Sequence, residues 1–206
     1  MIEILYEDAG IIVCIKPRGM ISEAGGLPDA LETQTGAAKI YCVHRLDRDV
    51  SGVMVCAKDS QSAGKIRLLE KEYLAVTEGI PTPPRGEMHD LLFHDRARNK
   101  TYVVTRKRAG VKEASLSYEV QAEGGDFCLV KLLLDTGRTH QIRVQLASRH
   151  CPICGDGKYG AKTKGAIALL CRRIDLLHPA TGKKMTFVCP LPGDGVWAGL
   201  EAETNA

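Results

Sequence analysis

The sequence has few aromatic residues and lacks long apolar runs, internal repeats and low-complexity segments. Aromatic residues make up 5% of its 206 residues, with a single tryptophan. A membrane-spanning helix needs about 20 consecutive apolar residues, and no stretch approaches that length. The first ten residues lack the basic start and apolar core of a secretory signal. These absences argue against repeat proteins, coiled coils and helical membrane proteins, and we expect a cytoplasmic protein whose eight cysteines are free thiols.

What is present fits a soluble globular protein with an uneven distribution of charge. Hydrophobic residues make up 44% and charged residues 26% of the chain. Between Arg138 and Arg173 there are eight basic residues and a single acid, Asp156, whereas residues 1–60 contain six basic and nine acidic residues. Such asymmetry is typical of a surface that binds a polyanion, although a solvated basic face gives the same pattern.

Short β-rich segments dominate the chain, and with few, separated helices they predict an α+β fold. Ile2–Tyr6 and Ile11–Ile15 are typical of an N-terminal hairpin. Further strands are expected at residues 53–57, 72–77, 101–105, 114–120, 127–134, 172–176 and 184–188. Short helices are expected at residues 29–40, from 59 or 60 to about 69, and at 140–148. The proline-rich residues 81–84 mark a candidate subdomain boundary near 81–85.

The most informative segment is His44-Arg45-Leu46-Asp47-Arg48-Asp49-Val50-Ser51-Gly52, which sets a carboxylate among basic side chains. Positive charge beside Asp47 favours its ionised form. An ionised, positioned carboxylate can act as a nucleophile or as a base. Asp47 is therefore the first candidate for catalysis.

Two further segments carry polar side chains that could serve a site. Residues 135–143 predict a strand end, a tight turn and a helix that hold several cationic and hydrogen-bonding groups near one point. Such a point can bind phosphate or pair with a buried acid. The segment Lys71–Ala75 places Tyr73 on a strand, where its ring can belong to the core or stack on a base.

Two other segments suggest different chemistry but lack the context that it needs. Residues 155–160 match Gly-x-Gly-x-x-Gly, yet a dinucleotide site needs a strand before this pattern and a helix after it, and neither is expected here. Cys151 and Cys154 form one Cys-x-x-Cys beside His150, whereas a structural zinc site needs four ligands. A metal enzyme that uses these three residues stays as an alternative that the spacing does not favour.

Taken together, the segments resemble the RluA-type family of RNA pseudouridine synthases. His44-Arg45-Leu46-Asp47 with Ser51-Gly52 resembles the family's H-R-L-D-x-x-T-S-G, and residues 71–75 resemble its K-x-Y-x-A. Residues 137–143 match its G-R-T-H-Q-I-R at every position, and residues 152–160 resemble its P-I-x-G-D-x-x-Y-G. The resemblance extends from Ile4 to Pro192, with departures from the family pattern at Val50, Gln145 and Leu170.

The resemblance implies a fold, a reaction and a set of site residues. The family fold is a mixed, largely antiparallel sheet in two halves, with few flanking helices and a central catalytic cleft. Residues 1–206 would then be a single catalytic domain without the S4-type RNA-binding domain of many relatives. The reaction converts a specific uridine of ribosomal or transfer RNA to pseudouridine and requires no metal or other cofactor. The implied catalytic residues are Asp47, Tyr73 and Arg143, and the implied substrate-binding residues are His44, Arg45, Arg138, Thr139, His140 and Gln141.

The family's chemistry assigns these residues distinct roles. Asp47 would act at or near ribose C1′, Arg143 would form the ion pair that orients it, and Tyr73 would stack on the uracil. A uridine inside a helix is out of reach, so it is expected to flip out of its stack, with Arg45 helping to hold the RNA open. We expect a monomer whose partner is RNA and which does not act at a membrane. An RNA-binding protein that has lost catalysis is the second alternative, and the intact catalytic set argues against it.

Overall fold

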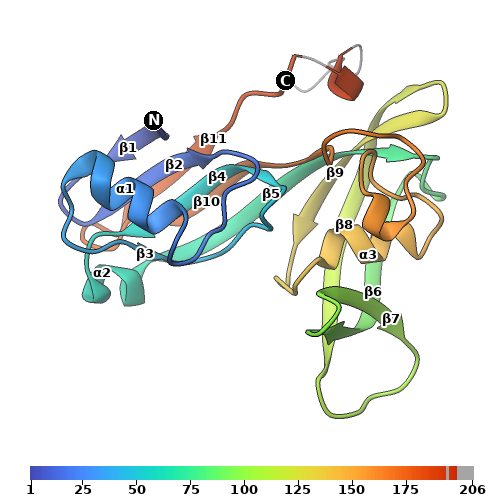
Figure 1. The fold of residues 1–206 in the computed structure, drawn as a ribbon, viewed down its shortest axis with the longest axis horizontal. Helices are drawn as coiled ribbons and strands as arrows, with labels where there is room; N and C mark the ends of the chain where they lie inside the picture. The colour runs from blue at the N-terminus through green and yellow to red at the C-terminus, as the bar shows by residue number, and fades with distance from the viewer. Residues whose placement is uncertain (194, 199–206) are drawn as a thin grey trace. The chain divides into compact units, whose positions relative to one another are not determined.

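The computed structural model describes residues 1–193 and 195–198. The chain divides into two compact units: unit 1 contains Met1–Glu72 and Leu170–Pro190, and unit 2 contains Tyr73–Leu169 and the described residues from Leu191 onward. Strands dominate both units, with three α-helices among the described residues, so the α+β prediction is confirmed (Figure 1). None of the described helices is long and apolar enough to cross a membrane.

Unit 1 is built on strands that follow the order β1-β2-β4-β10-β5, with β3 paired to β4 and β11 to β10. β4 and β10 pair in parallel over a short stretch, whereas β1 with β2, β2 with β4, β3 with β4 and β10 with β11 are antiparallel. The central strands β2 and β4 are apolar and almost wholly buried. The strands are β1 (Glu3–Glu7), β2 (Ile11–Lys16), β3 (Tyr41–Cys42), β4 (Ser51–Ala57), β5 (Arg67–Glu78), β10 (Leu169–Leu177) and β11 (Lys184–Val188).

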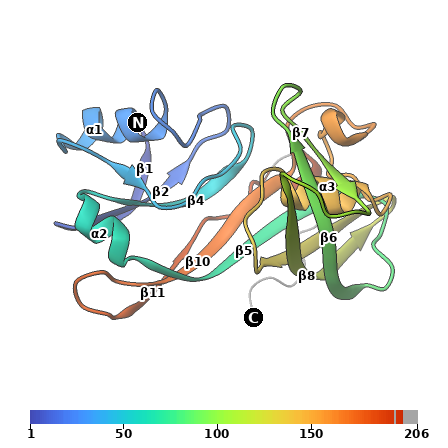
Figure 2. The ribbon, with the colours of Figure 1, turned by 90° about the horizontal axis from the view of Figure 1, so that it is seen from below.

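The helices α1 (Leu27–Thr35) and α2 (Ser60–Lys65) flank these strands (Figure 2), and both are shorter than the sequence predicts. α1 begins two residues early because Pro28 suits a first helical turn, and it ends at Gly36, whose φ of 73° closes the helix. Asp59 caps α2 as expected, since its carboxylate accepts a 2.7 Å hydrogen bond from the Ser62 amide. α2 nevertheless stops at Lys65, because the chain enters the twelve-residue strand β5 at Arg67.

The strands of unit 2 follow the order β5-β9-β8-β6-β7, in which β5 is the strand that both units share. The pairs β8–β9, β6–β8 and β6–β7 are antiparallel. The sequence misses β6 altogether, because the inward face of this strand places Asp90 between the buried Met88 and Leu92 and so interrupts the apolar alternation. The additional strands are β6 (Arg85–Asp95), β7 (Lys100–Val104), β8 (Val111–Gly124) and β9 (Phe127–Leu134).

Helix α3 (Gln141–Ala147) lies beside the strands of unit 2 and packs Val144 against Leu92 and Ala114 (Figure 1). The proline-rich residues 81–84 connect β5 to β6 within unit 2. The chain passes between the units after Glu72, Leu169 and Pro190. The single catalytic domain over residues 1–206 stays a prediction, and residues 194 and 199–206 lie outside the described part of the chain.

Candidate active site

The loop that carries Asp47 joins β3 to β4 in unit 1, and both of its ends are fixed. Before Asp47, the backbone of the buried Leu46 exchanges hydrogen bonds with the Ser22 hydroxyl at 2.9 and 3.1 Å. After it, Gly52 adopts φ 126°, and a Cβ atom there would lie 2.3 Å from the Cys171 carbonyl oxygen. Only glycine allows this approach between β4 and β10, which explains the Ser-Gly that follows the acidic segment.

A buried lysine supports the same loop, and no local pattern of residues indicates it. Lys16 is fully buried, and its Nζ donates to the carbonyls of Met20 at 2.7 Å, Pro17 at 3.0 Å and Arg48 at 3.3 Å. Burial lowers the pKa of Lys16 to about 8, against the opposing effect of the nearby carboxylates of Asp47 and Asp49. The ammonium group therefore ties the strand β2 to the backbone beside Asp47.

The pKa of Lys16 predicts a specific pH dependence of stability. The folded-state value of about 8 lies below the ordinary value of 10.5, so between these pH values the unfolded chain binds the extra proton. The free energy of unfolding should therefore rise across this window, by up to about 3 kcal/mol relative to a Lys16→Met variant. Urea unfolding of both proteins from pH 7 to 11 measures this difference, and parallel pH curves would contradict the assignment.

The histidine and arginine before Asp47 differ in their surroundings. Burial, with a smaller contribution from Lys71, lowers the pKa of His44 to about 3, so its ring is neutral at physiological pH. His44 Nε2 accepts a 3.1 Å hydrogen bond from the Val55 amide, which places the ring proton on Nδ1, an atom with no hydrogen-bond partner among the described residues. Arg45 is exposed and forms a 2.6 Å ion pair with Glu23.

In unit 2, the residues between β9 and α3 are held mainly by contacts with the protein. Gln141 accepts hydrogen bonds from the Arg138 amide and the Thr136 hydroxyl, and its Nε2 donates to the Ser115 carbonyl at 3.0 Å. The Thr139 carbonyl accepts a 2.8 Å hydrogen bond from the Thr101 hydroxyl. These contacts hold the turn that delivers the chain into α3.

Arg143 lies on α3 and is held by a buried carboxylate. Its Nε and Nη2 atoms donate to the two oxygens of Asp156 at 2.6 and 2.9 Å, and the side chains are 6% and 1% exposed. A bidentate pair of this kind fixes both the position and the plane of a guanidinium. Gly155 lets Asp156 reach this place, because a Cβ atom at Gly155 would lie 2.2 Å from the Ala166 carbonyl oxygen.

Tyr159 connects Arg143 to the rest of unit 2. The Arg143 guanidinium carbon lies 5.1 Å from the centre of the Tyr159 ring, a cation–π contact. The Tyr159 hydroxyl accepts a 2.8 Å hydrogen bond from the Thr101 amide and lies 2.8 Å from His140 Nδ1. Burial raises the pKa of Tyr159, so the hydroxyl keeps its proton and can donate to His140.

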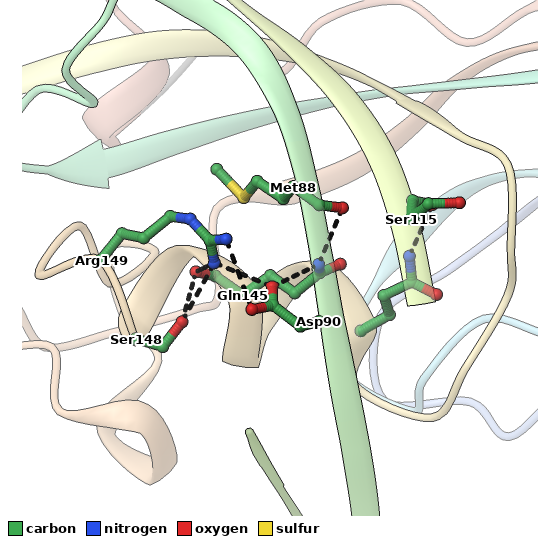
Figure 3. Close-up of polar contacts among 7 residues, drawn as sticks. Met88, Asp90, Ser115, Gln145, Ser148 and Arg149 are labelled. Atoms are coloured by element: carbon green, nitrogen blue, oxygen red, sulfur yellow. Dashed lines mark hydrogen bonds and ion pairs between the residues drawn. The ribbon is translucent and has the colours of Figure 1, made fainter. Parts of the chain in front are cut away.

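A second polar cluster fastens α3 to β6, and it involves Gln145, where the family usually has histidine (Figure 3). Gln145 is fully buried, and its Nε2 donates to Asp90 at 2.7 Å and to the Met88 carbonyl at 3.3 Å. Arg149 donates to the same Asp90 carboxylate at 2.9 Å. Asp90 therefore accepts hydrogen bonds from Gln145 in the last turn of α3 and from Arg149 just after the helix, both on the C-terminal side of Arg143.

The family assignment follows from comparison with known proteins. A family model described as RNA pseudouridylate synthase matches residues 10–148. The chain belongs to the RNA pseudouridine synthase family. The RluA-type resemblance is thereby confirmed, and the protein is an isomerase that acts on RNA.

Its relatives include bacterial and human pseudouridine synthases. The uncharacterized RNA pseudouridine synthase YlyB of Bacillus subtilis is 31% identical, over 94% of this chain and 70% of that protein. Ribosomal large subunit pseudouridine synthase D of Haemophilus influenzae is 31% identical, over 95% and 69%. The solved structure of human RNA Pseudouridylate Synthase Domain Containing 4 matches with a TM-score of 0.74 and 26% identity, over 92% of this chain and 88% of that chain.

The expected site residues of the synthase are divided between unit 1 and unit 2. His44, Arg45 and Asp47 lie on one loop of unit 1, and residues 138–143 form the turn and helix start of unit 2. Tyr73 stands on β5 in unit 2 and is 5% exposed. Sequence reasoning assigned no role to Lys16, Asp156 or Tyr159. For Asp156 a signal was present, because it is the only acid between Arg138 and Arg173.

The cysteine and glycine segments do not form the alternative sites. A short 3₁₀ turn at Gly157–Tyr159 lies within the glycine pattern, and the next described element is the strand β10 instead of the α-helix that a dinucleotide site needs. Burial raises the pKa of Cys151 and raises that of Cys154 to about 11, so both are protonated thiols at neutral pH. The described residues contain no group of three or more His, Cys, Asp or Glu side chains arranged to hold a metal ion.

Proposed function

We propose that this synthase isomerises a specific uridine in ribosomal or transfer RNA, with Asp47 as the catalytic carboxylate. The observation that carries the proposal is the buried bidentate pair between Asp156 and Arg143, the last residue of the segment that matches the family motif at every position. A guanidinium that is buried and fixed in this way is suited to bind a second anion in a defined geometry. We propose Asp47 as that anion.

The reaction sets requirements that the proposed residues can meet. It breaks the bond between uracil N1 and ribose C1′, joins C5 to C1′, moves the C5 proton away and leaves N1 protonated. Asp47 would attack at or near C1′, and pairing with Arg143 would keep it ionised and oriented. The Tyr73 ring would stack on the detached uracil. A tyrosine hydroxyl stays protonated at neutral pH, so a role as base would need help from its surroundings.

Substrate access requires that the uridine leave its stack, because its C1′ and N1 atoms cannot be reached inside a helix. Arg45 is exposed and can exchange its ion pair with Glu23 for a phosphate. The His44 Nδ1–H group is buried and has no hydrogen-bond partner among the described residues, so we propose that a polar atom of the flipped nucleotide accepts from it once the nucleotide enters the site. Both residues flank Asp47 on the same loop, which supports their assignment as substrate-binding residues.

The proposal is tested with RNA labelled with tritium at uracil C5 and isolated from cells that lack the gene. We expect the purified protein to release tritium from ribosomal or transfer RNA and to leave the RNA chain intact. Chromatography of the digested nucleosides should show pseudouridine in an amount equal to the tritium released. Ribosomal RNA is the first substrate to test, because the Haemophilus influenzae relative is named ribosomal large subunit pseudouridine synthase D. Release from neither RNA class would overturn the proposal.

A further inference from the structure

A basic groove crosses one end of unit 2, apart from the residues implied for catalysis. It has a volume of about 550 Å³, and four basic side chains line it against one acidic side chain. The groove is formed by the start of β8, the preceding loop, β6 and the turn before α3. Its lining residues are Leu91, Lys107, Arg108, Val111, Lys112, Glu113 and Arg138.

The two arginines of the groove are held in place by the protein. Arg138 Nε donates to the Glu113 carbonyl at 2.9 Å, which uses one of the five guanidinium donors. The guanidinium carbon of Arg108 lies 4.8 Å from the centre of the Phe93 ring. A guanidinium that is already oriented loses less conformational entropy when it binds an anion.

The groove keeps a net positive charge, because its two lysines and two arginines face a single carboxylate. Lys107 forms an exposed ion pair with Glu113, and this contact lowers the pKa of Glu113. Exposed pairs of this kind are weak, so Lys107 can exchange its partner for a phosphate. Lys112 is exposed at the start of β8. Leu91 and Val111 are half-buried and add apolar surface between the charged groups.

The groove shares one residue with the segment that carries Arg143. Arg138 belongs to both, since it lines the groove and begins the turn that leads through Thr139 and His140 into α3. All of these residues lie within unit 2, so their relative positions are those of one compact body. A polyanion bound in the groove would therefore contact the segment that carries Arg143 at Arg138.

We propose that this groove binds the phosphodiester backbone of the RNA substrate beside the modified uridine, through Lys107, Arg108, Lys112 and Arg138. The inference rests on the proposed function and extends it from Arg138, a residue of the family motif, to Lys107, Arg108 and Lys112, which lie outside the family motifs. RNA is favoured over an acidic peptide because fixed guanidiniums suit phosphate oxygens, and apolar surface between them suits sugars and bases. The contacts would supply affinity without reading the sequence.

The test compares three variants of the full chain with the parent. The first combines Lys107→Gln, Arg108→Gln and Lys112→Gln. The second keeps the charges by combining Lys107→Arg, Arg108→Lys and Lys112→Arg. The third removes the same charge from exposed lysines of unit 1 by combining Lys39→Gln, Lys65→Gln and Lys183→Gln. Thermal unfolding checks that each variant is folded.

Binding is measured by fluorescence anisotropy with a fluorescein-labelled 20-nucleotide RNA stem–loop over a range of salt concentrations. In the glutamine variant of the groove, the slope of log Kd against log salt should fall by about 2, since each lost phosphate contact removes 0.7–0.9. With tritium-labelled RNA, we expect KM to rise about tenfold and kcat to change less than twofold. The charge-keeping variant and the unit 1 variant should stay near the parent.

Three outcomes would overturn the inference. One is a glutamine variant with the slope and KM of the parent, and another is an equal loss in the unit 1 variant. The third is unchanged RNA binding together with lost binding of a labelled polyglutamate peptide, which would assign the groove to acidic proteins. If the parent forms no pseudouridine, the proposed function fails by itself, and the salt slope still decides whether the groove binds RNA, because it requires no catalysis.

Discussion

Replacing Asp47 by asparagine should lower the rate of pseudouridine formation by at least about a thousandfold, as expected for loss of a nucleophile. The amide has nearly the same shape but cannot attack C1′ or carry the negative charge that Arg143 is proposed to meet. The loop should stay in place, because Ser22, Lys16 and Gly52 hold its backbone on both sides of Asp47. Single-turnover tritium release and RNA binding by anisotropy measure the two effects separately.

Asp49 provides a matched control for this substitution. It lies two residues further along the same loop, is exposed, and occupies a variable position of the family motif. Asp49→Asn removes the same charge near Lys16 and should leave the rate close to that of the parent. Equal losses in the two variants would mean that the charge of the loop, and not the Asp47 carboxylate itself, supports the reaction.

Replacing Asp156 by asparagine should destabilise the protein by about 3–5 kcal/mol, because it removes the buried carboxylate that holds the Arg143 guanidinium in two hydrogen bonds. The pair is almost wholly buried, so water cannot replace the lost partner. Activity should fall as well, since Arg143 loses the contact that sets its plane. Urea unfolding gives the change in the free energy of unfolding, and tritium release gives the change in rate.

Two further variants separate stability from function. Glu119→Gln breaks the 2.9 Å ion pair with Lys131, which is much more exposed, and should cost less than about 1 kcal/mol. Combining Asp156→Leu with Arg143→Met removes both buried charges and should recover much of the lost stability while activity stays low. A recovery of activity in this double variant would exclude Arg143 from the reaction.

The sequence predicts most of the strands and the residues proposed for catalysis. The hairpin of β1 and β2, and the strands β9, β10 and β11, are recognisable because apolar runs are bounded by turn residues. Asp47, Tyr73 and Arg143 are recognisable because each stands in a short ordered motif. The local sequence pattern is sufficient to predict these strands and these motif residues, because both depend on residues that are neighbours in the chain.

Some features that the sequence misses depend on contacts between distant segments, and others depend on the local path of the backbone. Lys16 is buried because it meets carbonyls of residues 17, 20 and 48, which no local pattern indicates. The strand β6 cannot be recognised from the sequence, because the inward-facing position 90 is an aspartate that accepts hydrogen bonds from Gln145 and Arg149 (Figure 3). The early ends of α1 and α2 depend on backbone geometry at Gly36 and on the start of β5.

Pseudouridine maps of ribosomal and transfer RNA test the proposed function most directly. The maps are compared between cells that carry, as the sole copy of the gene, either the parent or the Asp47→Asn variant at equal protein level. We expect at least one position to carry pseudouridine with the parent, and uridine both with the variant and in cells that lack the gene. Identical maps with the parent and the variant would contradict the role of Asp47, and a map unchanged by loss of the gene would contradict the proposed activity on these RNAs.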